Sequence, residues 1–178
     1  CDSDWSSDVC SSDLPARAAA PVVDPATLEP TEAQRQATRL ITRFISQYHY
    51  RKTPLDDELS AVIHERFLEA LDPNRHYLLA ADVADLERHR LRYDDMLRGA
   101  RLEPAFDAFR LFRRRMEETM DHALDLVDRE FDFAREEYFE IDRSESPWPA
   151  DRAAREELWR KRVKHDVLSL RLADKDEE

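Results

Sequence analysis

Glycine is nearly missing from this sequence, with one residue in a chain of 178. At the average usage of about 7%, a chain of this length would contain roughly a dozen glycines. Tight hairpins and phosphate-cradling loops need glycine because it reaches positive φ without a steric cost. The composition therefore argues against sheet-rich folds and against nucleotide-binding folds built on glycine loops.

Long apolar runs are missing as well, since none exceeds five residues, whereas a membrane-spanning helix needs about 20. Acidic side chains outnumber basic ones by 40 to 28, which gives a net charge of −12. An excess of this size repels phosphate backbones. We expect one domain with a tail, without a membrane span and without nucleic acid as a partner.

Cysteine occurs at Cys1 and Cys10 and nowhere else, within a segment that differs from the rest of the chain. Residues 1–30 are rich in serine, aspartate, alanine and proline and have little to bury, so we interpret them as a disordered tail. The near-repeats Ser6-Ser7-Asp8 and Ser11-Ser12-Asp13, together with the missing initial Met, indicate that residues 1–14 are not native. They resemble a translated sequencing adapter.

Residues 15–20 resemble the end of a signal peptide, because Ala16-Arg17-Ala18-Ala19-Ala20 has the small-x-small pattern of a cleavage site. An alternative is that Cys1 is the lipidated first residue of a lipoprotein, but the cleavage-like site would then lie downstream without a purpose. The rest of the chain needs no disulfide, which is compatible with export. We expect residues 15–20 to be the remnant of an export signal.

From Thr31 onward the apolar residues repeat with helical spacing. Thr31 and Gln34 form a capping box, and the apolar face of the helix that follows consists of Ala37, Leu40, Ile41, Phe44, Ile45 and Tyr48. A second helix begins at Thr53-Pro54, ends at Asp72-Pro73-Asn74 and is expected to bury Leu55, Leu59, Val62, Ile63, Phe67 and Leu71. We expect these two helices to face each other across a short loop.

Three further helices are predicted. The first runs from Asp82 to Gly99, which is expected to take the left-handed position after the helix; it uses Val83, Leu86, Tyr93 and Leu97. The longest follows Pro104 and spans about seven turns, with Leu102, Phe106, Phe109, Met116, Met120, Ala123 and Val127 in its pattern. The last begins near Asp151 and is expected to bury Ala154, Leu158, Trp159, Val163, Val167 and Leu170.

The fold class is therefore all-α, with about five amphipathic helices over residues 31–173. Residues 131–149 lose the helical period and carry two prolines around Trp148, which favours an extended path. Residues 174–178 are charged and are expected to begin a linker.

Catalytic and metal-binding patterns are not found in the sequence. No histidine has a glutamate three residues before it, so the Glu-x-x-His pair of di-iron bundles is missing. His64 and His122 come closest, and we interpret both as surface or helix-end histidines, which disfavours a helical metalloenzyme. The serines outside the tail have no glycine nearby to form a nucleophile elbow. We expect no catalytic, cofactor-binding or metal-binding residue.

Clustered charges are interpreted as solvated helix faces. The basic clusters have glutamates at pairing distance and consist of Arg110, Arg113, Arg114 and Arg115, and of Arg160, Lys161, Arg162 and Lys164. The adjacent carboxylates point about 100° apart on a helix and are interpreted as solubility charges; they are Asp56-Asp57, Asp94-Asp95 and Glu136-Glu137.

Two series of short strings carry a resemblance to a known family. The first series is His49-Tyr50-Arg51, Leu55-Asp56, Ser60, Arg66-Phe67-Leu68, Leu71-Asp72-Pro73 and Leu78-Leu79-Ala80-Ala81-Asp82. The second series is Asp132-Phe133, Tyr138, Ile141-Asp142-Arg143, Trp148-Pro149, Leu158-Trp159, Val163-Lys164 and Leu168-Ser169-Leu170. In order and spacing they resemble the N-terminal helical domain of the tail-specific proteases, over about residues 31–175.

The resemblance implies part of a periplasmic carboxy-terminal processing serine protease of a Gram-negative bacterium, which acts on proteins with apolar C-terminal tails. In that family a PDZ domain and a catalytic domain with a Ser/Lys dyad follow the helical domain, and a lipoprotein adaptor of the outer membrane docks on helical segments. No catalytic residue of the family is carried over to this sequence, and its partner-binding residues stay unassigned. The shared residues are interpreted as fold-keeping: Trp148 and Trp159 pin the extended segment against the last helix, and Asp142-Arg143 brace its turn.

Two hypotheses follow. The first is that the chain is the non-catalytic helical domain of such a protease and positions its PDZ and catalytic modules. The alternative is a free-standing helical adaptor that binds a helix of another protein in a groove.

Overall fold

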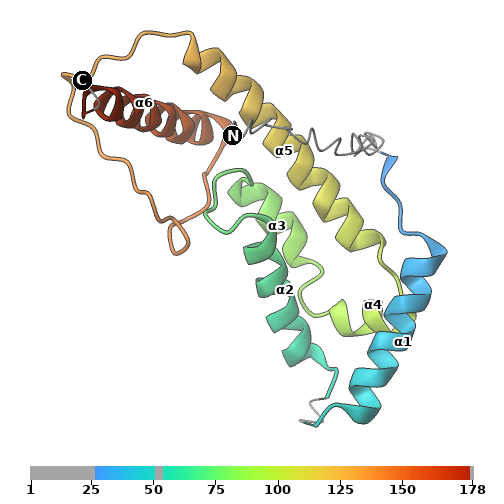
Figure 1. Cartoon of the computed structure of the whole chain (residues 1–178). Helices are drawn as coiled ribbons and strands as arrows, with labels where there is room; N and C mark the ends of the chain where they lie inside the picture. Colours follow the sequence, from blue (N-terminus) through green and yellow to red (C-terminus); the bar gives the residue numbers. More distant parts are fainter. Residues whose placement is uncertain (1–26, 51–53, 177–178) are drawn as a thin grey trace, which may run out of the picture.

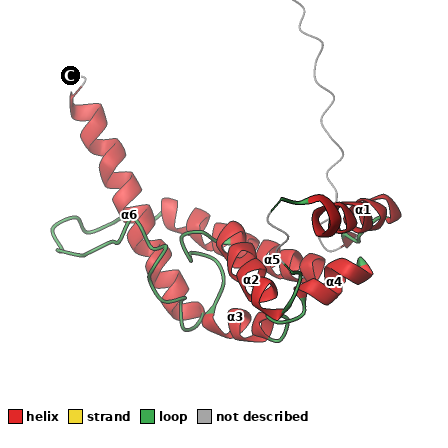
Figure 2. Ribbon diagram, turned by 90° about the horizontal axis from the view of Figure 1, so that it is seen from below, coloured by secondary structure: helices red, strands yellow, loops and turns green. Residues whose placement is uncertain are grey.

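The computed structural model describes residues 27–50 and 54–176, with side chains up to Ala173. These residues form six α-helices and no strand (Figure 2), which confirms the all-α prediction. None of the described helices has the length and apolarity that a bilayer span requires. The expected tail over residues 1–26 lies outside the described residues.

Helix α1 (Glu32–Tyr48) begins at the predicted capping box, in which the Thr31 hydroxyl accepts from the Gln34 N–H and the Gln34 side chain accepts from the Thr31 N–H. Helix α2 (Asp57–Leu71) begins later than Thr53-Pro54 because the Asp56 carboxylate caps it, accepting from the Leu59 N–H at 3.1 Å. Asp56 is therefore an N-cap and not a solubility charge.

The helix expected from Asp82 to Gly99 is two helices, α3 (Ala80–Glu87) and α4 (Tyr93–Gly99). A turn of short-range backbone hydrogen bonds separates them, from His89 to Leu86 and from Arg92 to His89. The turn redirects the chain so that Tyr93 is buried against α2, where its ring lies beside His64 and Phe67. Tertiary packing thus breaks a segment whose sequence is continuous in helical spacing.

The expectation that Gly99 takes the left-handed position is wrong. Gly99 is the last residue of α4 and has no positive φ, whereas Ala100 lies in the left-handed region at φ 49°. Ala100 is 2% exposed, so its methyl group gains burial that offsets part of the backbone strain.

Replacing Gly99 by alanine should stabilise the domain by about 0.5–1 kcal/mol, because glycine inside a helix is less favourable than alanine by that amount. A Cβ at this position would meet only the flexible side chain of Arg101, at 3.4 Å. Urea unfolding would measure the change. A loss of more than about 1 kcal/mol would contradict the helical conformation of Gly99.

Helix α5 (Glu103–Val127) has the predicted seven turns and is the spine of the domain. Figure 1 shows α1 and α4 beside its first turns and α6 (Arg152–Asp176) beside its far end, with the extended residues 128–151 looping between them. The extended path predicted for residues 131–149 is confirmed.

Two apolar clusters form the core. One joins α2, α3 and α5 through Leu68, Leu78, Leu86 and Ala108, and the other joins α5 to α6 through Leu126, Trp159 and Val163. Two residues expected to be buried in α6, Ala154 and Leu170, are exposed, while Arg155 and Lys164 are buried. The reason is that α6 packs on α5 with one face and its far end projects from the body (Figure 2).

The expectation that α1 faces α2 is also wrong. α1 packs on α4, which in turn packs on α2. The apolar face of α1 turns away from the body, since Leu40, Phe44 and Tyr48 are 62–71% exposed. Val62, expected in the buried face of α2, is exposed as well.

Candidate functional site

The loop between α2 and α3 is organised by one carboxylate. Asp72 is 1% exposed, and its two oxygens accept from the backbone N–H groups of His76, Tyr77 and Leu78, each at 2.9 Å. These three donors would otherwise be buried without partners, which is costly. Asp72 therefore holds the loop in the one shape that presents its carbonyl groups to α6.

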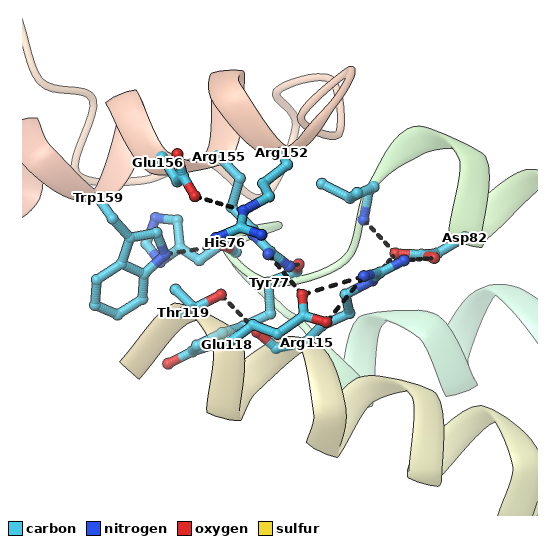
Figure 3. A network of polar contacts seen from close by, with 11 residues as sticks. His76, Tyr77, Asp82, Arg115, Glu118, Thr119, Arg152, Arg155, Glu156 and Trp159 are labelled. Atoms are coloured by element: carbon cyan, nitrogen blue, oxygen red, sulfur yellow. Dashed lines mark hydrogen bonds and ion pairs between the residues drawn. The ribbon is translucent and has the colours of Figure 1, made fainter. Parts of the chain in front are cut away.

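Two side chains of α6 bind those carbonyl groups (Figure 3). The Trp159 indole N–H donates to the His76 carbonyl at 2.9 Å, and Arg155 donates to the Tyr77 carbonyl at 3.0 Å. Arg155 also donates to a Glu118 carboxylate oxygen on α5 at 2.9 Å, although its side chain is only 2% exposed. One buried guanidinium thus joins α6, α5 and the loop.

The same network continues to α3. Arg115 makes a two-pronged pair with Asp82, at 2.8 and 2.9 Å, and also donates to Glu118. Burial raises the pKa of Asp82, but the hydrogen bonds from Arg115 and from the Leu79 N–H outweigh it and leave that pKa below its usual value. The pKa of Glu118 is lowered in the same way, with Arg155 and Arg115 as the donors that outweigh burial.

The extended segment is attached by a second ionic cluster. The Glu137 carboxylate pairs with Arg160 and with the Lys164 ammonium, the latter at 2.6 Å. The hydrogen bonds from Arg160 and then Lys164 lower the pKa of Glu137 to about 2. Glu137 is therefore a structural anchor on α6, and its interpretation as a solubility charge is wrong.

Trp148 and Trp159 do not share the expected role of pinning the extended segment against α6, because they pack in different clusters. Trp159 lies in the α5–α6 cluster, where Phe131 of the extended segment also packs. Trp148 packs instead on the cluster of α2, α3 and α5 and lies under the Arg75 guanidinium, 5.4 Å from the ring centre. Asp142 accepts from Ser144, and Arg143 donates to the Pro147 carbonyl, so this pair does brace the turn.

Histidine and aspartate side chains that the sequence placed at the surface lie inside. His64 is 1% exposed, with its Nε2 at 3.5 Å from Glu87. Asp94 is 5% exposed, and it accepts from the Ser60 hydroxyl and from Arg98. The burial of His64 and Asp94 could not be predicted from the sequence, because it results from contacts between α2 and the separate helix α4.

The basic clusters divide into structural and exposed members. Arg115, Arg160 and Lys164 are tied to carboxylates of other segments, as described above, and Arg113 pairs with Glu117 on its own helix. Arg162 lies over the Trp159 ring and beside the His76 Nδ1. Arg114 is exposed, as expected for a solvated helix face. The expectation is wrong for Arg115, Arg160 and Lys164, which connect different segments of the chain.

Three serine hydroxyls in the described part of the chain are engaged in structural hydrogen bonds. The hydroxyl of Ser60 pairs with Asp94, and those of Ser46 and Ser169 donate to carbonyl groups of their own helices. Residues 27–50 and 54–176 contain no cluster of three side chains suited to a metal ion. The arrangement is one in which charged side chains fix the shape of the domain.

Acidification should weaken this arrangement at His76. The ring is 4% exposed, and burial, followed by the charge of Arg162, lowers its pKa to about 4. The unfolded chain takes up the proton near the ordinary value of about 6.5, so stability is lost as the pH falls from that value toward 4.

Urea midpoints at pH 7 and pH 5 would measure this loss, which His76→Gln should reduce. His165→Gln, at a histidine that reaches solvent, is the control and should leave the pH dependence unchanged. An unaltered pH dependence in His76→Gln would contradict a buried, neutral His76.

The fold and its contacts define an all-α domain whose loop, spine and last helix are locked together by buried charged side chains. The chain belongs to the family of tail-specific protease N-terminal domains, because the model of that family, "Tail specific protease N-terminal domain", matches residues 41–178. It is 34% identical over 175 residues to the tail-specific protease of Haemophilus influenzae. That match covers 96% of this chain and 25% of the relative, so the chain spans about a quarter of the length of the curated relative.

Proposed function

We propose that residues 31–173 are the non-catalytic N-terminal helical domain of a periplasmic carboxy-terminal processing serine endopeptidase, and that they position its PDZ and catalytic modules. The observation that carries the proposal is the match of nearly the whole chain to one quarter of a tail-specific protease. In the parent protein a Ser/Lys dyad performs the hydrolysis of proteins with apolar C-terminal tails.

The internal contacts support a positioning role. Arg155, Arg115 and Glu137 are all engaged within the domain, so α5, α6 and the extended segment form one connected unit. A connected unit of this kind holds the direction in which α6 leaves the body, and with it the placement of whatever follows residue 178.

Exposed apolar side chains support the presence of covering modules. Near its C-terminal end α6 exposes Leu168, Leu170 and Leu172, by 39%, 67% and 54%. Apolar surface of this kind is typical of interfaces with other protein parts. In this proposal the far end of α6 is embedded in the next module, and an outer-membrane lipoprotein adaptor docks on the helical domain.

The first experiment reads the gene through the codon for Glu178. The proposal expects a frame that continues into a PDZ-like segment and a domain with a Ser/Lys dyad, preceded by a basic and apolar leader. A stop codon soon after Glu178 would overturn it in favour of the free-standing helical adaptor.

The second experiment compares the full-length protein with the 1–178 chain on a peptide that ends in apolar residues. The full-length protein should cleave it, and the 1–178 chain should not. Deleting residues 32–176 from the full-length protein should lower kcat/KM by at least tenfold if the domain positions the other modules. Unchanged kcat/KM would contradict the positioning role.

A further inference from the structure

Helix α1 is oriented opposite to an ordinary amphipathic helix. It approaches the body with polar side chains, since Arg35, Thr38 and Thr42 are its half-buried residues and Arg35 pairs with Glu103 at 2.7 Å. Its apolar residues point outward, with exposed fractions of 70% for Leu40 and 57% for Ile41. A surface helix normally turns its apolar stripe toward the core, so this face is built to be covered by something else.

The charged side chains of α1 beyond its first residue are all basic. The described residues 33–50 contain no aspartate or glutamate and three arginines, in a chain whose net charge is −12; they are Arg35, Arg39 and Arg43. Within the described residues Arg39 pairs with Glu32, at the start of the same helix, and Arg43 forms no ion pair. The partner that complements this face is therefore apolar at its centre and acidic at its edge.

A second copy of the chain does not fit that description. Two such faces would bring like charges together. The five large apolar side chains, exposed by 50–71%, offer roughly 500 Å², below the ~800 Å² per partner of a stable interface.

An anionic membrane fits less well than a protein surface. Basic amphipathic helices do bind anionic lipid, but the rest of this chain carries all of its acidic excess and would be repelled by such a surface. The small area points instead to a partner held nearby by the chain itself, because tethering supplies a millimolar effective concentration.

We propose that the apolar face of α1 binds an acidic-edged, apolar helix or sheet surface in the part of the same polypeptide that follows Glu178. This inference rests on the proposed function, because it requires a longer parent chain. It gives α1 the role of a clasp that returns from the start of the domain to a later module.

Thiol labelling of the full-length protein tests the contact, in a background where Cys1 and Cys10 are replaced by serine. A cysteine introduced by Ile41→Cys should react at least tenfold more slowly in the full-length protein than in the 1–178 chain. The matched control is Leu91→Cys, at a leucine that is 52% exposed and lies outside α1; its rate should be similar in both proteins. Equal labelling of Ile41→Cys in both proteins, or equal protection of the two cysteines, would overturn the proposal.

Two further measurements test the acidic edge and the competing partners. Raising the salt from about 0.05 M to 0.5 M, or adding Arg43→Glu, should speed the labelling of Ile41→Cys in the full-length protein several-fold, because both weaken attraction between opposite charges. Labelling that ignores both changes would overturn the acidic partner. Dimers of the 1–178 chain in ultracentrifugation, or its sedimentation with vesicles containing phosphatidylglycerol, would overturn it in favour of a second copy or a lipid surface.

The outcomes separate this inference from the proposed function. A frame that stops near Glu178 removes both. A frame that continues into the protease modules, with Ile41→Cys still fully reactive, leaves the proposed function in place and removes the clasp.

Discussion

Replacing Arg155 by methionine is expected to destabilise the domain by about 2 kcal/mol, because the Tyr77 carbonyl loses its side-chain donor and Glu118 keeps only Arg115 of its two arginine partners. The guanidinium is 2% exposed and serves both Glu118 on α5 and the Tyr77 carbonyl in the loop after α2. Methionine keeps the length of the side chain, so the loss reports the polar contacts more than the packing. Urea unfolding at pH 7 measures it.

The matched control lies one turn earlier on the same helix. Arg152 pairs with Glu156 at 2.6 Å, but its side chain is 73% exposed, so Arg152→Met should leave the urea midpoint nearly unchanged. A double-mutant cycle of Arg155→Met with Glu118→Gln should give a coupling of about 1–3 kcal/mol. Similar losses at Arg155 and Arg152, with no coupling to Glu118, would contradict the proposed lock between α5 and α6.

Replacing Asp72 by alanine is expected to cost about 4 kcal/mol. Three backbone N–H groups donate to this carboxylate, and each buried donor left without a partner costs about 1–3 kcal/mol before the loop relaxes. The loop should also lose the shape that presents the His76 and Tyr77 carbonyl groups to α6. Hydrogen exchange at residues 76–78 would rise together with the loss of stability.

Two further variants serve as controls for Asp72→Ala. Asp72→Asn keeps one acceptor oxygen and should cost about half as much as alanine. Asp142→Ala removes a similar acceptor from the Ser144 N–H in an exposed turn and should leave the stability of the domain nearly unchanged. A loss at Asp72 no larger than the loss at Asp142 would show that the loop holds its shape without the carboxylate.

Helix positions were predictable where local chemistry decides them. The capping box at Thr31 and the seven-turn helix after Pro104 were both found from sequence, since a cap depends on neighbours three residues away and a long period averages over many side chains. The start of α2 was missed because Asp56 competes with Thr53-Pro54 as a cap, and the sequence does not rank the two.

Helix boundaries and burial were not predictable where they depend on residues distant in the sequence. The break between α3 and α4 follows from the packing of Tyr93 on α2, which no local pattern encodes. The structural roles of Glu137, Asp94 and Arg155 were missed for the same reason, because each is set by a partner more than twenty residues away. The sequence pattern shows a charged residue, and only the partner decides whether that charge is exposed or buried.

The amino-acid sequence by itself determined the all-α class, the long central helix, the extended segment around Trp148 and the family resemblance, because each depends on composition, period or short strings. The tertiary structure decided which face of each helix is covered. It turned the apolar face of α1 outward and placed charged residues of α6 inside. The reason is that burial depends on two surfaces in contact. The local sequence of a helix specifies its own surface but not the surface that packs against it.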